Sequence, residues 1–218
     1  MSKKIGVVLS GCGVRDGSEI HEAVLTLLAI DQAGAEAVCM APDSELAEVN
    51  HCTMESTGAR RKVLVESARI ARGTITDIKQ VTAGDLDALI FPGGFGAALN
   101  LCDFAQKGAA ASVNSEVARL VREVHAAQKP IGAICIAPTL LALVLGKTAG
   151  PTLTIGNDAA TAAEIEKTGA RHQNCGVTEF VVDTKNRIVT TPAYMLGTRI
   201  SEVAVGITKC VNEVIKLA

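Results

Sequence analysis

The feature of this sequence that most constrains its fold is a set of short apolar runs that end abruptly at glycine, cysteine or proline. Residues 5–9 lead into Ser10-Gly11-Cys12-Gly13, residues 87–91 into Pro92-Gly93-Gly94, and residues 130–134 into Cys135 and Pro138. Such runs predict buried strands, and helical patterns lie between them. Alternating strands and helices predict an α/β fold, a three-layer sandwich around a mostly parallel sheet, in which ligands bind at the carboxyl ends of the strands.

The remaining patterns extend this alternation along the whole chain. Asp16 and Glu19 form a capping-box pattern ahead of a helical stripe that Gly34 ends. Further helices are expected over residues 60–70, 113–127 and 203–217, and further strands over residues 35–40, 152–155, 179–183 and 187–190. A Lys185-Asn186 turn predicts that the last two strands form a hairpin.

The composition indicates a folded chain with a large apolar core. Hydrophobic residues make up 48% of the 218 residues and aromatic residues only 2%, so the core consists mainly of Ala, Val, Leu and Ile. The net charge of -2 and the lack of a basic block argue against a nucleic-acid partner, and no apolar stretch is long enough for a membrane span. We expect one domain over residues 1–218, and a cytoplasmic protein because no leader pattern is recognised.

Cys135 is the strongest candidate for a reactive residue. It lies between a predicted strand and a helix that begins near Pro138, and at such a corner the helix N-terminus is expected to lower the pKa of the thiol. The amides of Gly93, Gly94 and Ile136 are candidates for stabilising an oxyanion. A buried structural cysteine is the alternative interpretation, because the seven cysteines are scattered without zinc spacing or CxxC pairs.

Several segments of the chain carry a family resemblance. Residues 91–96 and 133–139 resemble the PfpI superfamily, whose fold is flavodoxin-like and of the class I glutamine amidotransferase-like type. Residues 9–22, 67–73 and 189–194 are similar to the ElbB-type glyoxalases, a group of small bacterial proteins once linked to isoprenoid biosynthesis. The resemblance runs nearly end to end.

The resemblance implies a glutamate that hydrogen-bonds the nucleophilic cysteine. Glu22 fits that role better than Glu19, since Glu19 has a sufficient role in capping the helix, whereas Glu22 lies among apolar residues where a charge is costly. A protonated Glu22 that donates to a Cys135 thiolate is the arrangement we expect. Cys12, in a strand-end loop, is a further candidate at the border of the site.

The resemblance also implies a function, a glutathione-independent glyoxalase of the hydro-lyase type that needs no cofactor or metal. Cys135 would add to glyoxal or methylglyoxal, Glu22 would move a proton, and water would release a 2-hydroxy acid; such activity can also reflect protein deglycation. A redox-responsive or partner-binding protein with an oxidisable Cys135 is the alternative. Compared with the superfamily, a peptidase is disfavoured because Ile136, not histidine, follows Cys135. An amidase or amidotransferase is disfavoured because no histidine follows His172. The superfamily further implies a homodimer.

Overall fold

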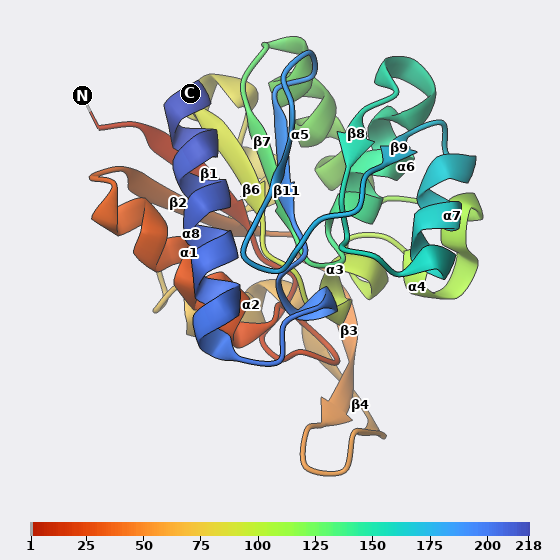
Figure 1. The fold of residues 1–218 in the computed structure, drawn as a ribbon. Helices are drawn as coiled ribbons and strands as arrows, with labels where there is room; N and C mark the ends of the chain where they lie inside the picture. The colour runs from red at the N-terminus through yellow and green to blue at the C-terminus, as the bar shows by residue number, and fades with distance from the viewer. Residues whose placement is uncertain (1) are drawn as a thin grey trace.

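A seven-stranded sheet forms the centre of the computed structural model, which describes residues 2–218 (Figure 1). The strands lie in the order β10-β11-β7-β6-β1-β2-β5, and each neighbouring pair is parallel except β10 and β11. Their bounds are β1 Lys4–Val8, β2 Glu36–Ala41, β5 Thr76–Asp77, β6 Ala88–Phe91, β7 Ile131–Ile134, β10 Val181–Asp183 and β11 Ile188–Thr191. The mostly parallel sheet confirms the predicted α/β fold class.

Helices cover both faces of the sheet (Figure 1). One face carries α1 (Ile20–Gln32), α2 (Val63–Ile70) and α8 (Ile200–Leu217), and the other carries α5 (Ser115–Ala126) and α6 (Pro138–Ala149). Because the central strands are buried on both sides, β6 and β7 are continuous apolar runs without alternation. Within the described residues, no helix has both the length and the apolar character that crossing a bilayer requires.

Shorter elements complete the architecture. A small parallel pair joins β8 and β9, and a separate antiparallel hairpin joins β3 and β4. The bounds are β3 Glu45–Asn50, β4 Glu55–Lys62, α3 Phe95–Leu99, α4 Phe104–Lys107, β8 Thr152–Leu153, α7 Ala159–Lys167 and β9 Arg171–His172.

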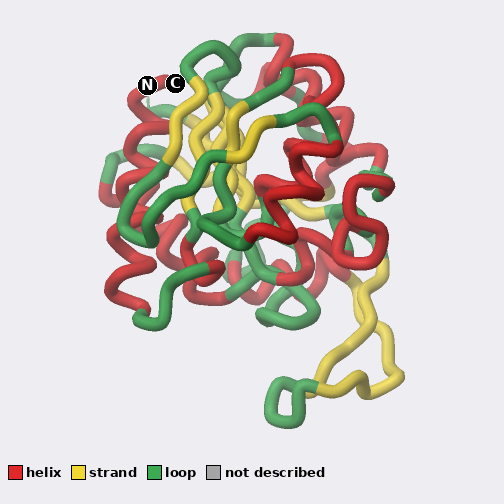
Figure 2. The backbone as a smooth tube through the Cα atoms, turned by 45° about the vertical axis from the view of Figure 1, so that its right-hand side comes forward, coloured by secondary structure: helices red, strands yellow, loops and turns green. Residues whose placement is uncertain are grey.

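The β3–β4 hairpin was not predicted, and it projects from the body of the molecule (Figures 1 and 2). The prediction of a helix over residues 60–70 is wrong in its first part, because Arg60, Arg61 and Lys62 belong to β4 and the helix begins at Val63. Pairing with β3 overrides the local helical pattern here, since the acidic side chains of β3 lie opposite the basic end of β4: Arg60 pairs with Glu45 at 2.7 Å.

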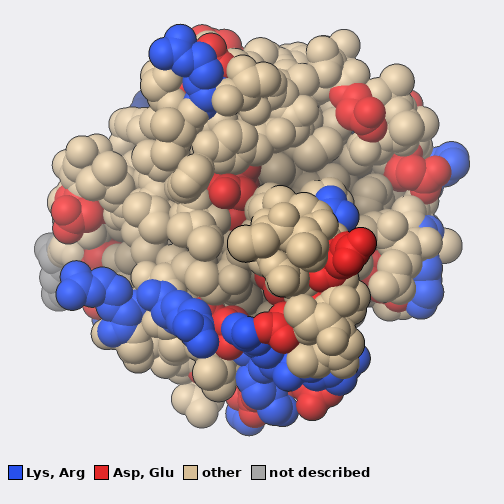
Figure 3. All heavy atoms as spheres, turned by 90° about the horizontal axis from the view of Figure 1, so that it is seen from below, with Lys and Arg blue, Asp and Glu red and all other residues tan. Residues whose placement is uncertain are grey.

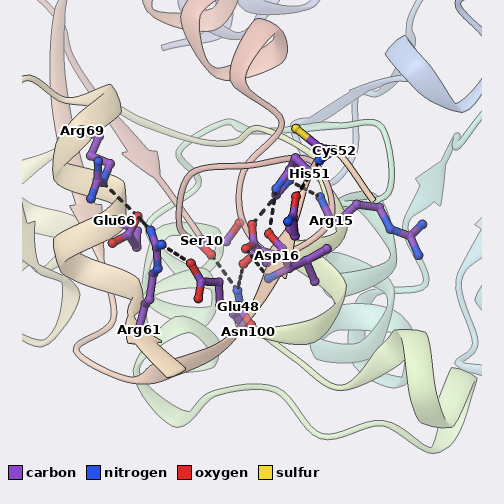
Figure 4. A network of polar contacts seen from close by, with 12 residues as sticks. Ser10, Arg15, Asp16, Glu48, His51, Cys52, Arg61, Glu66, Arg69 and Asn100 are labelled. Carbon is purple, nitrogen blue, oxygen red and sulfur yellow. Dashed lines mark hydrogen bonds and ion pairs between the residues drawn. The ribbon is translucent and has the colours of Figure 1, made fainter. Parts of the chain in front are cut away.

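Charged side chains hold the base of the hairpin against the body, and acidic and basic groups gather at this end of the molecule (Figures 3 and 4). Asp16 accepts a hydrogen bond from the Val49 amide through Oδ2 at 2.9 Å, and Arg61 lies between Glu48 and Glu66. Asp16 therefore anchors the hairpin and does not form the capping box predicted for it. The N-cap of α1 is Glu19, whose side chain accepts from the Glu22 amide at 2.7 Å.

Candidate active site

Cys135 follows β7 directly and lies in a strained turn. Its φ is 63°, a left-handed conformation that is rare for a residue with a side chain. The Cys135 amide donates to the Thr191 carbonyl of β11 at 2.9 Å, and α6 begins at Pro138 three residues later. The chain thus turns sharply from strand to helix, as the sequence predicted, and the thiol stands at the carboxyl edge of the sheet, 8% exposed.

Glu22 occupies the first turn of α1 and is completely buried. Its Oε1 accepts a hydrogen bond from the Tyr194 amide at 3.1 Å. Its Oε2 has no geometrically ideal hydrogen-bond partner among the described residues. A buried carboxylate oxygen without a strong partner is costly, and this favours the protonated form of the group.

Gly93 shows how closely Cys135 and Glu22 approach each other. A Cβ atom built on Gly93 would lie 2.3 Å from Cys135 Cβ and 2.4 Å from Glu22 Oε2. Both groups therefore contact the same backbone position, one from β7 and the other from α1. Only glycine leaves room for this approach, which explains physically why the loop after β6 carries no side chain here.

Burial sets the protonation states of the pair. Burial, assisted by the negative charge of Glu19, raises the pKa of Glu22 to about 8, and the Tyr194 amide opposes this rise. Burial and the neighbouring Glu22 also raise the pKa of the Cys135 thiol well above its ordinary value. The sequence-based expectation of a lowered thiol pKa is wrong, because desolvation outweighs the opposing amides at the start of α6. At neutral pH both groups carry their protons.

The amides of Gly94 and Ile136 lie against the sulfur of Cys135 and favour its ionised form. Neither amide donates to a backbone carbonyl in the described part of the chain. Gly94 has a φ of 96°, and a Cβ there would lie 2.3 Å from the Glu19 amide, so this position also requires glycine. The structure thus brings Gly94 and Ile136, two of the three donors that the sequence suggested for an oxyanion, next to the thiol. The third, the Gly93 amide, lies against the Glu22 carboxyl group.

A pocket of about 440 Å³ opens in front of the thiol. Both Cys135 and Glu19 line it, whereas Glu22 does not. The lining residues come from the segments that follow β1, β6, β7 and β11 and from the start of α7: Val14, Glu19, Gly94, Phe95, Cys135, Ile136, Asp158, Thr161, Tyr194 and Met195. Among these described residues there is no histidine, so the geometry of a Cys-His pair is not present at this pocket.

Tyr194 and Asp158 are site residues that the sequence did not single out. Tyr194 follows β11 and contributes two groups, its amide to Glu22 and its hydroxyl to His21 Nδ1 at 2.8 Å. The signal for it was present in the family-like segment 189–194, whose last residue is this tyrosine. Asp158 has no comparable signal, because its place at the pocket depends on how the loop before α7 folds back.

Cys12 does not join the Cys135 site. It lines a separate pocket of about 170 Å³ together with Asp16, His51 and Glu66 at the base of the hairpin. The loop that carries it reaches the Cys135 pocket through Val14 instead. The expectation that Cys12 borders the site is therefore corrected. Across residues 2–218 no group of three or more His, Cys, Asp and Glu side chains is arranged to hold a metal ion.

Two mammalian proteins are similar to this chain over almost all of its length. The rat ES1 protein homolog, mitochondrial (Rattus norvegicus), is 46% identical and matches 98% of this chain and 84% of the relative. The human glutamine amidotransferase-like class 1 domain-containing protein 3, mitochondrial (Homo sapiens), is also 46% identical and matches 98% of this chain and 83% of the relative.

The names of both relatives place them in mitochondria, and this contradicts the cytoplasmic location expected from the sequence. The expectation failed because a compartment is specified by a targeting segment, whereas composition and charge describe the folded core.

The fold and the sequence agree on the family. The crystal structure of an isoprenoid biosynthesis protein with an amidotransferase-like domain from Ehrlichia chaffeensis superposes with a TM-score of 0.92, at 37% identity, over 99% of this chain and 100% of that one. The sequence profile of the DJ-1/PfpI family matches residues 13–194, a range that includes Glu22, Gly93, Gly94 and Cys135. Profile, relatives and topology together show that the chain belongs to the DJ-1/PfpI family.

Proposed function

We propose that this protein is a glutathione-independent glyoxalase that converts glyoxal or methylglyoxal to the 2-hydroxy acid without a cofactor. The observation that carries the proposal is the contact of Cys135 and Glu22 across Gly93, where Cys135 lines a pocket and the amides of Gly94 and Ile136 lie against its sulfur. A soft nucleophile, a carboxyl group and an anion-binding pair are the groups that this reaction needs. The DJ-1/PfpI family includes glyoxalases as well as peptidases.

The protonation states suggest how the first step proceeds. The pKa of Glu22, about 8, leaves a minor fraction of carboxylate at neutral pH, and this carboxylate takes the proton of the Cys135 thiol as the sulfur attacks the aldehyde carbon. The carbonyl oxygen becomes an oxyanion, which the amides of Gly94 and Ile136 stabilise until it receives a proton. The product of this step is a hemithioacetal.

The later steps use the same carboxyl group. Glu22 removes the proton from the carbon bonded to sulfur, and the electrons of that C–H bond form an enediol. The proton returns to the neighbouring carbon while the hydroxyl proton of the first oxygen passes to the second oxygen, which gives a thioester of the 2-hydroxy acid. Water then attacks the thioester, the C–S bond breaks and the thiol regains its proton. The sum is one dicarbonyl plus one water to one 2-hydroxy acid, so no external oxidant or reductant is required.

The redox alternative has less support from the geometry. Oxidation and attack on a carbonyl both need the thiolate of Cys135, whose pKa is raised well above the ordinary value. A pocket of about 440 Å³ in front of the thiol has a use in the glyoxalase reaction, whereas oxidation needs no such space. The half-exposed Cys12 and Cys175 and the exposed Cys52 are more accessible to oxidants.

The experiment is a steady-state assay of methylglyoxal consumption and 2-hydroxy acid formation with the wild type, Cys135→Ser and Cys175→Ser. We expect turnover in the wild type, a loss of about 100-fold or more in Cys135→Ser, and near-normal turnover in Cys175→Ser, whose thiol lies outside the pocket. A wild-type protein that forms no 2-hydroxy acid, or a fully active Cys135→Ser, would show that the proposal is wrong.

A further inference from the structure

The space in front of Cys135 is much larger than a three-carbon dicarbonyl. The pocket of about 440 Å³ adjoins a second one of about 530 Å³, and Phe95, Ile136 and Thr161 line both. Pockets of these sizes typically enclose ligands with a substantial apolar body. Methylglyoxal would occupy only the part next to the thiol, and the space beyond it would stay empty.

The pocket of about 440 Å³ next to Cys135 is the inner pocket, and the adjoining one is the outer pocket. The charged side chains that line the inner pocket are all acidic. Glu19 and Asp158 line it, and no Lys, Arg or His does so among the residues described. Asp158 N-caps α7 by accepting from the Thr161 amide at 2.8 Å, and this interaction with Thr161 lowers the pKa of the carboxyl, so it is ionised at neutral pH. A substrate that carries an anionic group would meet these two carboxylates without a cation to offset them.

Two cations lie close to the space but are engaged elsewhere. The Arg15 guanidinium lies over the ring of Phe95, 4.5 Å from the ring centroid, and does not line the inner pocket. Lys107 lines the outer pocket of about 530 Å³, and its ammonium group pairs with Asp103 at 2.5 Å. Glu164 lines the same pocket and is itself paired with Lys167 at 2.5 Å. The inner pocket therefore favours uncharged or cationic groups, whereas the charges at the outer pocket are paired with each other.

We infer that the physiological substrate is a carbonyl compound with an apolar body that extends from Cys135 past Ile136 into the outer pocket, and that the site selects against substrates with an anionic group. This inference rests on the proposed function, since it assumes that Cys135 attacks the substrate. The same charges assist the last step, because the carboxylate product forms beside Glu19 and Asp158 and is repelled from the pocket.

The first test measures substrate selection without turnover. The rates at which iodoacetate, iodoacetamide and iodoacetanilide alkylate Cys135 are followed by mass spectrometry, and each is divided by the rate for N-acetylcysteine. The three reagents share the same reactive iodomethyl group. Iodoacetate also carries a carboxylate and iodoacetanilide carries an apolar ring, whereas iodoacetamide carries neither. We expect the normalised rate to be several-fold higher for iodoacetanilide than for iodoacetamide, and several-fold lower for iodoacetate.

Variants that remove one negative charge test whether the pocket causes the selection against iodoacetate. Asp158→Asn keeps the N-cap of α7 but removes one charge, so it should bring the iodoacetate rate closer to the iodoacetamide rate. Glu166→Gln removes a charge from α7 outside both pockets and should leave the ratio unchanged. Equal normalised rates for the three reagents, or a preference for iodoacetate, would overturn the inference, and the latter would assign anion binding to Arg15.

A second test uses turnover and separates this inference from the proposed function. Phenylglyoxal should have a kcat/KM at least several-fold above that of methylglyoxal, and its 4-carboxy derivative should fall below phenylglyoxal by a similar factor. Turnover of all three at equal kcat/KM would refute the inference and leave the glyoxalase proposal intact. Absence of turnover with every dicarbonyl would refute the glyoxalase proposal, and the alkylation rates would then decide the selectivity of the pocket alone.

Discussion

At the scale of single residues, the site depends on a thiol and a carboxyl group that both contact the buried backbone at Gly93. Cys135 was identifiable from the sequence because it lies at a strand end, whereas Glu22 was identified through the family resemblance and its place among apolar residues. The Tyr194 amide was not, because it reaches Glu22 across 172 positions of the chain. The pKa of Cys135 was misjudged for a related reason, since the depth of burial depends on residues from several elements that meet only in the fold.

Replacing Glu22 by Gln should affect the reactivity of Cys135 and the turnover in opposite directions. The Glu22 carboxylate raises the pKa of the Cys135 thiol, so Glu22→Gln should shift the pH profile of Cys135 alkylation to lower pH. The same variant lacks a group that can carry the proton, so dicarbonyl turnover should fall by about 100-fold or more. Alkylation by iodoacetamide and product formation are measured on the same samples from pH 6 to 10.

Glu19→Gln is the matched control on the same helix. Glutamine can still accept from the Glu22 amide, so most activity should remain and the free energy of unfolding should fall by at most about 1 kcal/mol. If Glu19→Gln abolishes turnover while Glu22→Gln does not, the two carboxyl groups have been assigned the wrong roles.

Gly93→Ala should damage the site through shape alone. The added Cβ would lie 2.3 Å from Cys135 Cβ and 2.4 Å from Glu22 Oε2, so the two groups must move apart. We expect turnover to fall by about 100-fold or more, with a loss of about 1–3 kcal/mol in the free energy of unfolding. Gly176→Ala, whose added Cβ has no atom within 4 Å, should change neither quantity. A Gly93→Ala protein with normal turnover would mean that the close approach is not needed.

At the scale of elements, the strands and helices of the main sheet were predicted well and the hairpin was missed. Residues 87–91 and 130–134 are apolar throughout, because burial on both faces leaves a strong signal in the sequence. The β3–β4 hairpin leaves only a weak signal in the sequence, since every residue of β4 is exposed and the strand shows no alternation of apolar and polar residues. Its pairing depends on side chains of the partner strand, which a reading of consecutive residues does not reveal.

The hairpin should loosen when its anchor to the body is removed. An isolated two-stranded hairpin is only marginally stable in water, and Asp16 ties β3 to the body through the Val49 amide. Asp16→Ala should therefore speed amide hydrogen exchange over residues 45–62 by about 10-fold or more, while the central strands keep their protection. Asp43→Ala, which removes only an exposed ion pair with Lys62, should not do so. Unchanged exchange in Asp16→Ala would show that the Arg61–Glu66 contact holds the hairpin instead.

At the scale of the whole molecule, we predict association into a homodimer. Ile20, Val24 and Leu28 form a stripe along α1 at helical spacing, and each is between 44% and 47% exposed. A twofold axis would bury this stripe against the same stripe of a second copy. Light scattering at micromolar concentration should give twice the monomer mass for the wild type and the monomer mass for Val24→Glu. A monomeric wild type would contradict the prediction.

The buried Glu22 also makes the stability of the whole fold depend on pH. Its pKa is about 8 in the folded protein and about 4.3 in an unfolded chain, so between these values the folded state holds a proton that the unfolded state has lost. Stability is therefore highest below the unfolded pKa, and this contribution is lost as pH rises through the folded pKa, by about 1.4 kcal/mol for each pH unit. Urea denaturation between pH 5 and 8 should show this loss in the wild type and a flatter profile in Glu22→Gln, because glutamine does not titrate. Parallel profiles for the two proteins would mean that Glu22 is ionised in the fold at neutral pH, and the step in which its carboxylate takes the Cys135 proton would then start from a full population of base.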